Sequence, residues 1–151
     1  MSNTYLISVK PQWANLFFDL DTPKTVELRK GSFGKVLIPG DRLLIYATLP
    51  MGKVLGSVTV CDHKELPIPE LRAVTESLAQ VSAEDFADYY QGKDSGVGVW
   101  VEKPELFESP IALDALKAAG ITPPQQITKL TQEQVELLLS AVQKKLNLWK
   151  K

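Results

Sequence analysis

Three of the four charged side chains in the segment PKTVELRKGS, residues 23–32, could do chemistry together: Lys24, Glu27 and Arg29. Two cations of this kind could hold phosphate groups, because arginine offers a planar bidentate fork and lysine a point charge. A carboxylate beside two cations is kept ionised. Glu27 could therefore accept a hydrogen bond from an amino group of a base, orient Arg29, or act as a general base.

The alternation of a β-strand decides which of these side chains share a face. Glu27 and Arg29 have the same parity, so a regular strand places both on one face and Lys24 on the other. All three reach one cleft only if a bulge or the first turn of the strand redirects the chain near Thr25. The competing interpretation is an ordinary ion pair between Glu27 and Arg29 on an exposed edge strand, worth about 0.2–1 kcal/mol.

Further residues suited to nucleic-acid binding lie near the ends of two predicted strands. Lys10 ends the first strand and Trp13 opens the next helix, so both lie at the mouth of the sheet. The indole of Trp13 either stacks on a base or anchors the helix in the core. Tyr46 is either a cleft residue or plain core. The candidates near the turn LPMGK are Tyr46, Thr48 and Lys53.

The elements that must position these residues are short and mixed in type. Alternating apolar residues predict strands over residues 5–10, 22–29, 42–48, 55–62 and 95–104. Helical spacing and end signals predict helices over residues 11–20, after Ser82, from Ser109-Pro110 to Gly120, and after Thr131. The absence of a strict βαβ alternation favours an α+β fold with a small mixed or barrel-like sheet.

Two helices begin with residues typical of a capping box. Ser82 and Asp85 have nearly this spacing, and Thr131 with Gln134 has it fully. Apolar residues flank both boxes as hydrophobic staples, Val81 with Phe86 and Leu130 with Val135. The last helix carries one apolar stripe, which either packs on the sheet or forms a homodimer face: Val135, Leu138, Leu139, Val142, Leu146 and Trp149.

The overall composition is that of one soluble globular domain of 151 residues, long enough to bury a sizeable core. The sequence contains no run of eighteen apolar residues, so we expect no membrane span. The first residues do not resemble a signal peptide. The single cysteine, Cys61, cannot form an internal disulfide, so a cytoplasmic location is expected. Cys61 and His63 are too few ligands for zinc, whereas magnesium held by carboxylates alone needs few protein ligands and stays open. We expect no metal site and no cofactor.

Charge is unevenly distributed along the chain. Residues 1–60 carry a net charge of +3, residues 61–110 of −7 and residues 111–151 of +3, which together give −1. A nearly neutral chain of this kind can bind nucleic acid if its basic groups share one face. A mixed, solvated surface would explain the same counts.

Two longer stretches resemble a known family: SVKPQWANLFFDLDTPKTVELRK and IPGDRLLIYATLPMGKVLGSVTV. Their order of strand, helix, strand and Pro-Gly-Asp turn is similar to the ASCH domain family, within the PUA-like superfamily. The family signature is Gly-x-Lys-x-x-Glu-x-Arg, and Lys24, Glu27 and Arg29 match its charged positions. Thr22 stands at the position of the family glycine. The resemblance covers residues 5–103.

This resemblance implies a small PUA-like β-barrel of five or six mixed strands surrounded by helices, with a cleft beside it. It implies an ASCH/PUA-like domain over residues 1–108, and residues 109–151 are expected to form a C-terminal helical extension packed on the same domain. It further implies binding of RNA, another single-stranded nucleic acid or a modified nucleoside, in a charged cleft centred on the KTVELR strand. Fold alone does not fix function, so this remains an analogy.

Hydrolysis is the alternative function that the resemblance implies. Some bacterial ASCH proteins are acetylcytidine amidohydrolases, in which a threonine at the position of Glu27 acts beside the lysine matched by Lys24. This chain departs from them, because it has glutamate there and Ala79 near the position of the family's catalytic glutamate. A ribonuclease would use Glu27 as the base, with Lys24 or Arg29 stabilising charge.

Overall fold

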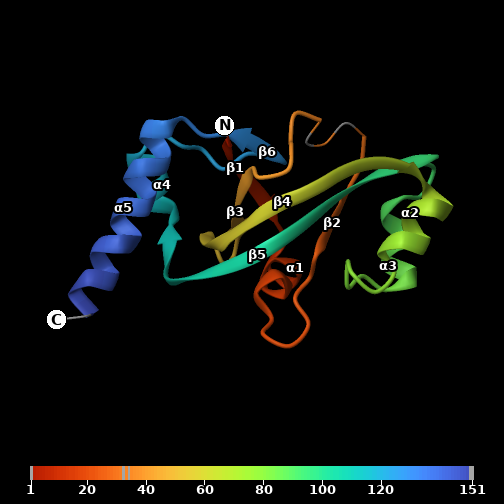
Figure 1. Cartoon of the computed structure of the whole chain (residues 1–151), viewed down its shortest axis with the longest axis horizontal. Coiled ribbons are helices and arrows are strands. Elements are labelled where there is room, and N and C mark those ends of the chain that lie inside the picture. Colours follow the sequence, from red (N-terminus) through yellow and green to blue (C-terminus); the bar gives the residue numbers. More distant parts are fainter. Residues whose placement is uncertain (1, 32, 34, 150–151) are drawn as a thin grey trace.

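The computed structural model describes residues 2–31, 33 and 35–149, except for the side chains from residue 141 onward. In this part of the chain, six strands form one mixed sheet in the order β2-β5-β4-β3-β1-β6 (Figure 1). The strands are β1 (Thr4–Val9), β2 (Val26–Arg29), β3 (Arg42–Ala47), β4 (Lys53–Pro67), β5 (Ser95–Ala112) and β6 (Ile127–Lys129). Strands β1 and β3 run parallel, and the other neighbouring pairs are antiparallel.

The helices lie between and around these strands. They are α1 (Pro11–Ala14), the 3₁₀ helix η1 (Asn15–Phe18), α2 (Ile68–Thr75), α3 (Ala83–Tyr89), α4 (Leu113–Ala118) and α5 (Gln132–Trp149). Figure 1 shows α2 and α3 at one end of the long antiparallel pair of β4 and β5, and α4 and α5 at the other. The α+β class is therefore confirmed. The pairing leaves β2 and β6 as the two ends of the strand order, so closure into a barrel is not confirmed.

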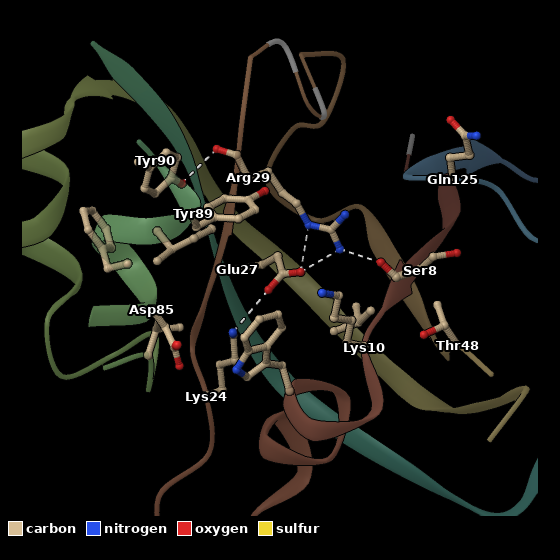
Figure 2. A pocket seen from close by; sticks show the side chains of 15 residues that line it. Ser8, Lys10, Lys24, Glu27, Arg29, Thr48, Asp85, Tyr89, Tyr90 and Gln125 are labelled. Carbon is tan, nitrogen blue, oxygen red and sulfur yellow. Dashed lines mark hydrogen bonds and ion pairs between the residues drawn. The ribbon is translucent and has the colours of Figure 1, made fainter. Parts of the chain in front are cut away.

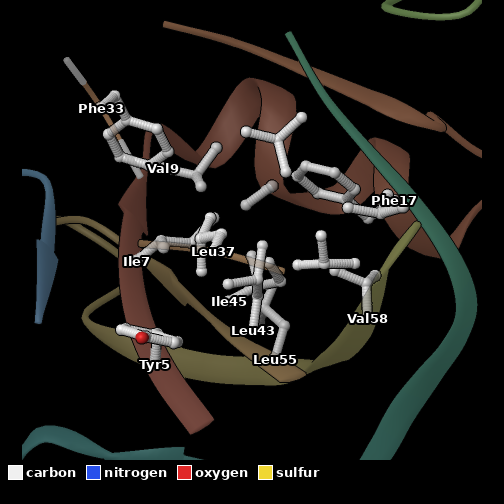
Figure 3. Close-up of a cluster of buried hydrophobic side chains, with 14 of the residues drawn as sticks. Tyr5, Ile7, Val9, Phe17, Phe33, Leu37, Leu43, Ile45, Leu55 and Val58 are labelled. Atoms are coloured by element: carbon white, nitrogen blue, oxygen red, sulfur yellow. The ribbon is translucent and has the colours of Figure 1, made fainter. Parts of the chain in front are cut away.

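Side chains of alternate parity on the sheet pack into separate clusters. One cluster lies between β1, β3, β4, β5 and the α1–η1 turn (Figure 3). Its labelled members are Tyr5, Ile7, Val9, Phe17, Phe33, Leu37, Leu43, Ile45, Leu55 and Val58. Residues of the opposite parity, such as Leu6 and Leu44, pack under α4 and α5 in a second cluster. The two parities of β1 and β3 are thus both buried, which explains their nearly continuous apolar sequences.

A third cluster fixes α2 and α3 against the edge strand β2. Val26 and Leu28 of β2 are buried there against Leu71 of α2 and Phe86 and Tyr90 of α3. Since Glu27 alternates with these two apolar residues, its side chain points to the other face of β2. This alternation separates the apolar packing of β2 from the polar side chains that the strand presents.

Several predicted element boundaries differ from the structure. The helix predicted over residues 11–20 is one turn of α-helix followed by a 3₁₀ turn that ends at Phe18. The helix start predicted at Ser109-Pro110 is wrong, because β5 continues to Ala112 and α4 begins at Leu113. The end predicted at Gly120 fits, since α4 ends at Ala118 and Gly120 has a φ of 75°. Pairing with β4 holds this last part of β5, where Ile111 lies opposite Val54.

The capping predictions are confirmed to different extents. At α5, the Thr131 N–H donates to Gln134 Oε1 (3.0 Å) and the Gln134 N–H donates to Thr131 Oγ1 (3.1 Å). At α3, the Asp85 N–H donates to Ser82 Oγ (3.0 Å). The reciprocal bond from Ser82 N–H to the Asp85 carboxylate is not among the hydrogen bonds of the described residues. Helix α5 therefore has a complete capping box and α3 has half of one.

The C-terminal helix packs on the sheet through the first part of its apolar stripe. Leu138 is buried in the second cluster, and Val135 and Leu139 pack against it. The side chains of Val142, Leu146 and Trp149 lie outside the described residues. None of the helices that the structure describes is both long enough and apolar enough to span a membrane.

Candidate functional site

A pocket of about 310 Å³ opens beside β2, between the end of β1, the α1 turn and helix α3 (Figure 2). Its charged lining residues are Lys10, Lys24, Glu27, Arg29 and Asp85. Its aromatic lining residues are Trp13, Phe86, Tyr89 and Tyr90, and its other lining residues are Ser8, Val9, Leu28, Thr48, Val81 and Gln125. The pocket thus combines a charged floor with aromatic walls contributed by separate elements.

The carboxylate of Glu27 bridges two cations at the base of this pocket. Its Oε1 lies 3.3 Å from Lys24 Nζ, and its Oε2 lies 2.7 Å from Arg29 Nη2. Arg29 Nε also donates to Oε2, at 2.9 Å. Figure 2 shows the three side chains converging on one point. We refer to Lys24, Glu27 and Arg29 together as the charged triad.

The backbone before β2 turns Lys24 onto the face of Glu27. Strand β2 begins only at Val26, so Lys24 is not bound by the alternation of the strand. Its N–H donates to the carbonyl of Leu16 (2.8 Å), and the Thr25 N–H donates to the carbonyl of Leu78 (3.0 Å). These bonds confirm the expected redirection of the chain near Thr25.

The triad is almost completely enclosed. Lys24 and Glu27 are only 3% and 4% exposed, so the interpretation as a solvated edge ion pair is wrong. Burial alone would raise the pKa of Glu27, but the charges of Arg29 and Lys24, together with their hydrogen bonds, lower it below its ordinary value. The carboxylate is therefore ionised at neutral pH, and the triad carries one net positive charge.

Arg29 is fixed from several directions. Its Nη2 donates to the carbonyl of Ser8 on β1 (2.7 Å), and its guanidinium lies 4.5 Å from the ring centroid of Phe33. Its own carbonyl accepts a hydrogen bond from the Tyr90 hydroxyl (2.9 Å), which ties β2 to α3. Burial raises the pKa of Tyr90, so this hydroxyl keeps its proton at neutral pH. Contacts from β1 and from the end of α3 thus hold Arg29 and its strand in place.

Two aromatic rings that line the pocket, those of Trp13 and Tyr89, have lysine side chains beside them. Lys10 Nζ is 5.7 Å from the ring centroid of Trp13, and Lys24 Nζ is 6.0 Å from the same ring. On α3, the ring of Tyr89 has Lys30 Nζ 4.4 Å from its centroid. Lys10 and Lys30 are exposed, so each adds a solvent-accessible positive charge beside an aromatic ring.

The structure brings together six of the eight residues predicted for the cleft, which are Lys10, Trp13, Lys24, Glu27, Arg29 and Thr48. Tyr46 does not line this pocket, because its parity on β3 turns it into the cluster under α4 and α5. Its alternative interpretation as a core residue fits this position. Lys53 is exposed at the start of β4 and also lies outside the pocket lining.

Several lining residues were not predicted from the sequence as cleft residues. Ser8 has the same parity as Lys10 on the first strand, and this signal could have found it. Tyr89 and Tyr90 follow Phe86 at helical spacing, which is typical of the buried stripe of a helix, and Tyr90 is indeed buried. Asp85 and Gln125 carry no local signal, because they reach the pocket only through the tertiary fold.

Neither Ala79 nor His63 brings a catalytic group to the pocket. Ala79 is buried in the apolar cluster under α2 and α3, so it brings no carboxylate to the pocket. The His63 ring nitrogen Nε2 lies 2.7 Å from the carbonyl of Phe33, and this bond ties β4 to the β2–β3 connection. His63 is not among the pocket-lining residues.

The chain is similar in sequence and in structure to proteins with an ASCH domain. No protein-family model matches the chain. The chain is 28% identical over 139 residues to a protein of Zymomonas mobilis named "ASCH domain-containing ribonuclease", and the match covers 89% of each chain. The crystal structure of ASCH from Zymomonas mobilis superposes with a TM-score of 0.83 at 26% identity, over 91% of this chain and 94% of that one. The resemblance to the ASCH domain family is thus confirmed in both sequence and fold.

A more distant neighbour shares only the fold. Human THYN1, in a crystal structure with DNA that contains 5-methylcytosine, superposes with a TM-score of 0.52 at 18% identity. That match covers 93% of this chain and 98% of the human one. The similarity to both neighbours extends well beyond residue 108, since more than nine-tenths of the chain is covered in each case.

Proposed function

We propose that this protein binds single-stranded RNA in the pocket beside β2. The observation that carries the proposal is the enclosed charged triad, which shares one pocket with the aromatic rings of Trp13 and Tyr89. Aromatic rings and cations are the two groups that proteins use to bind single strands, by stacking bases and by neutralising phosphates. Both occur here within one nucleotide-sized space.

The size of the pocket favours a single base over a duplex. About 310 Å³ is at the lower end of the range for pockets that hold small ligands. Such a pocket takes one base and its sugar when the base is unstacked from its neighbours, as single-stranded RNA permits. Lys10, exposed beside Trp13, can then contact a phosphate of the same strand.

The names of relatives agree with RNA as the ligand. The Zymomonas mobilis protein, similar over nearly the whole chain, is named a ribonuclease. Human THYN1, which shares the fold alone, was crystallised with DNA. Single-stranded DNA of the same sequence is therefore the informative comparison ligand.

The test is a fluorescence titration of a short labelled single-stranded RNA, at low and at moderate salt. We expect the affinity to fall as salt rises, because phosphate contacts release counterions. RNA should bind more tightly than DNA of the same sequence. Affinity that does not change with salt, or no binding at low salt, would contradict the proposal.

A second candidate function is cleavage of the bound RNA, favoured by the name of the Zymomonas mobilis relative. In that case Lys24 and Arg29 would stabilise the negative charge that develops at the phosphate. Glu27 would be a weak base, because both of its oxygens are paired with cations and its pKa is lowered. Running the titrated samples on a denaturing gel distinguishes the two functions, since only a ribonuclease shortens the RNA.

Further predictions concern the C-terminal segment, the alternative ligand, the oligomeric state and the location of the protein. We also propose that residues 109–151, expected as a helical extension, pack on the same ASCH/PUA-like domain. Leu116 of α4 and Leu138 of α5 share a cluster with Leu6 of β1, and the segment also contributes the end of β5 and strand β6 to the sheet. A modified nucleoside is the alternative ligand for the same pocket. A homodimer through α5 and a cytoplasmic location remain predictions from the sequence.

A further inference from the structure

Asp85 is a pocket residue that neither the triad nor the helix cap uses. It lines the pocket from the first turn of α3. Figure 2 shows the Asp85 side chain away from the triad, with no dashed line to any other residue drawn. Among the described residues, its carboxylate takes part in no ion pair and no hydrogen bond.

A second helix of the same chain shows what a capping role would look like. At α5, the Gln134 side chain accepts from the N–H of Thr131 and so completes the capping box. Asp85 stands at the equivalent position of α3, yet only its backbone N–H is bonded, to Ser82 Oγ. The cap at α3 therefore leaves both oxygens of Asp85, an exposed residue of the pocket lining, free to accept hydrogen bonds.

The charge of Asp85 is opposite to what phosphate binding needs. The triad carries one net positive charge, and Lys10 adds another at the pocket. A carboxylate in this place repels phosphate but accepts hydrogen bonds from the donor groups of a base. Guanine is the base that matches a carboxylate best, because its N1–H and its 2-amino group are two adjacent donors.

We propose that Asp85 makes the pocket selective for guanine, by accepting hydrogen bonds from N1–H and the 2-amino group of one unstacked base. This inference rests on the proposed binding of single-stranded RNA and names the base that the pocket holds. Asp85 is then a specificity-determining residue. Lys10 contacts the phosphate and the aromatic rings contact the face of the base.

The test compares two short RNAs that differ in one chemical group. One contains guanine and the other contains inosine at the same positions, which lacks only the 2-amino group. The proteins are the wild type, Asp85→Asn and the control Asp88→Asn, which removes the same charge from an exposed position of the same helix outside the pocket. Circular dichroism verifies that all three are folded.

We expect the wild type and Asp88→Asn to bind the guanine RNA about tenfold more tightly than the inosine RNA. Asp85→Asn should bind both RNAs with equal affinity, since an amide offers one acceptor where the carboxylate offers two. Equal binding of both RNAs by the wild type would overturn the inference while leaving RNA binding intact. Preserved discrimination in Asp85→Asn would overturn it too. Failure of the wild type to bind any RNA would overturn the proposed function, and this inference with it.

Discussion

Lys24 Nζ lies 3.3 Å from Glu27 Oε1, and the two side chains are only 2% and 6% exposed. The same carboxylate binds Arg29 through its other oxygen at 2.7 Å. Burying three charges is costly unless they are paired with good geometry, and here every buried side-chain N and O atom of the described residues has a partner. Such a network makes a polar floor for a ligand.

Replacing Glu27 with glutamine should destabilise the protein strongly. The change leaves the charges of Lys24 and Arg29 buried beside each other without a counter-charge. We expect the free energy of unfolding to fall by about 3 kcal/mol, measured by chemical denaturation. The control is Glu105→Gln, which breaks an exposed ion pair with Arg42 and should cost less than about 1 kcal/mol. Equal effects of the two substitutions would contradict the enclosed triad.

The stabilisation by Glu27 should disappear in acid. Although burial opposes it, the charges of Arg29 and Lys24 bring the pKa of folded Glu27 below its ordinary value of 4.5. A lowered pKa contributes stability that is complete above the unfolded pKa and is lost as the pH falls through the folded pKa. The measured quantity is the difference in free energy of unfolding between wild type and Glu27→Gln. We expect it to be constant above pH about 6 and to shrink as the pH falls below 4.5. A difference that stays constant down to the acid transition would contradict this linkage.

Lys10 should contribute to RNA binding through its charge alone. It is exposed beside Trp13 and lies outside the triad, so Lys10→Ala should leave the fold intact. We expect weaker binding of single-stranded RNA. The slope of log affinity against log salt should fall by about one, as for the loss of one phosphate contact. Lys117→Ala, on α4 and outside the pocket lining, is the charge-matched control. A control that weakens binding as much as Lys10→Ala would point to a diffuse charge effect.

Tyr89 should act as a stacking surface. Its ring lines the pocket and is partly exposed. Tyr89→Phe keeps the ring and should keep the affinity for RNA, whereas Tyr89→Ala should lose about 1–3 kcal/mol of binding free energy. The measurement is the same titration with labelled RNA. If both variants bind like the wild type, Tyr89 does not contact a base.

Gly56 should not tolerate a side chain. A Cβ atom at this position of β4 would lie 2.2 Å from the carbonyl oxygen of Glu105 and 2.8 Å from the ring of Phe18. Because a backbone oxygen cannot move aside cheaply, Gly56→Ala should lower the melting temperature strongly. Gly98→Ala is the milder comparison, since its nearest contact is the ring of the partly exposed Trp100 at 2.9 Å. The reverse order of melting temperatures would contradict the register of β4 and β5.

The core of the candidate site was predictable because its residues are close in sequence. Strand parity alone separated Lys24 from Glu27 and Arg29. The resemblance to the ASCH signature pointed to one cleft for all three, and the redirected chain near Thr25 follows from that requirement. Tyr46 was not predictable in this way, since both parities of β3 are buried and the sequence alone does not tell which face the pocket adjoins. Asp85 belongs to a helix far along the chain, and only the packing of α3 on β2 brings it to the pocket.

The length of strand β4 shows that prediction of the fold from the sequence is limited in a similar way. The strand predicted over residues 55–62 continues to Pro67, through the charged residues of the sequence DHKELP. These residues break the apolar alternation on which strand prediction depends. Backbone pairing with residues 95–100 of β5 keeps this segment extended nonetheless. Long-range pairing of this kind leaves little trace in local sequence.

The measurement that tests the account most directly is the fluorescence of Trp13 in a chain where Trp100 and Trp149 are replaced by phenylalanine. Trp13 lines the pocket, so it reports on ligand entry there. We predict that single-stranded RNA quenches this fluorescence with the same affinity that a label on the RNA reports. Binding reported by the label with unchanged Trp13 fluorescence would place the RNA elsewhere on the protein. Absence of binding by either signal would contradict the proposed function.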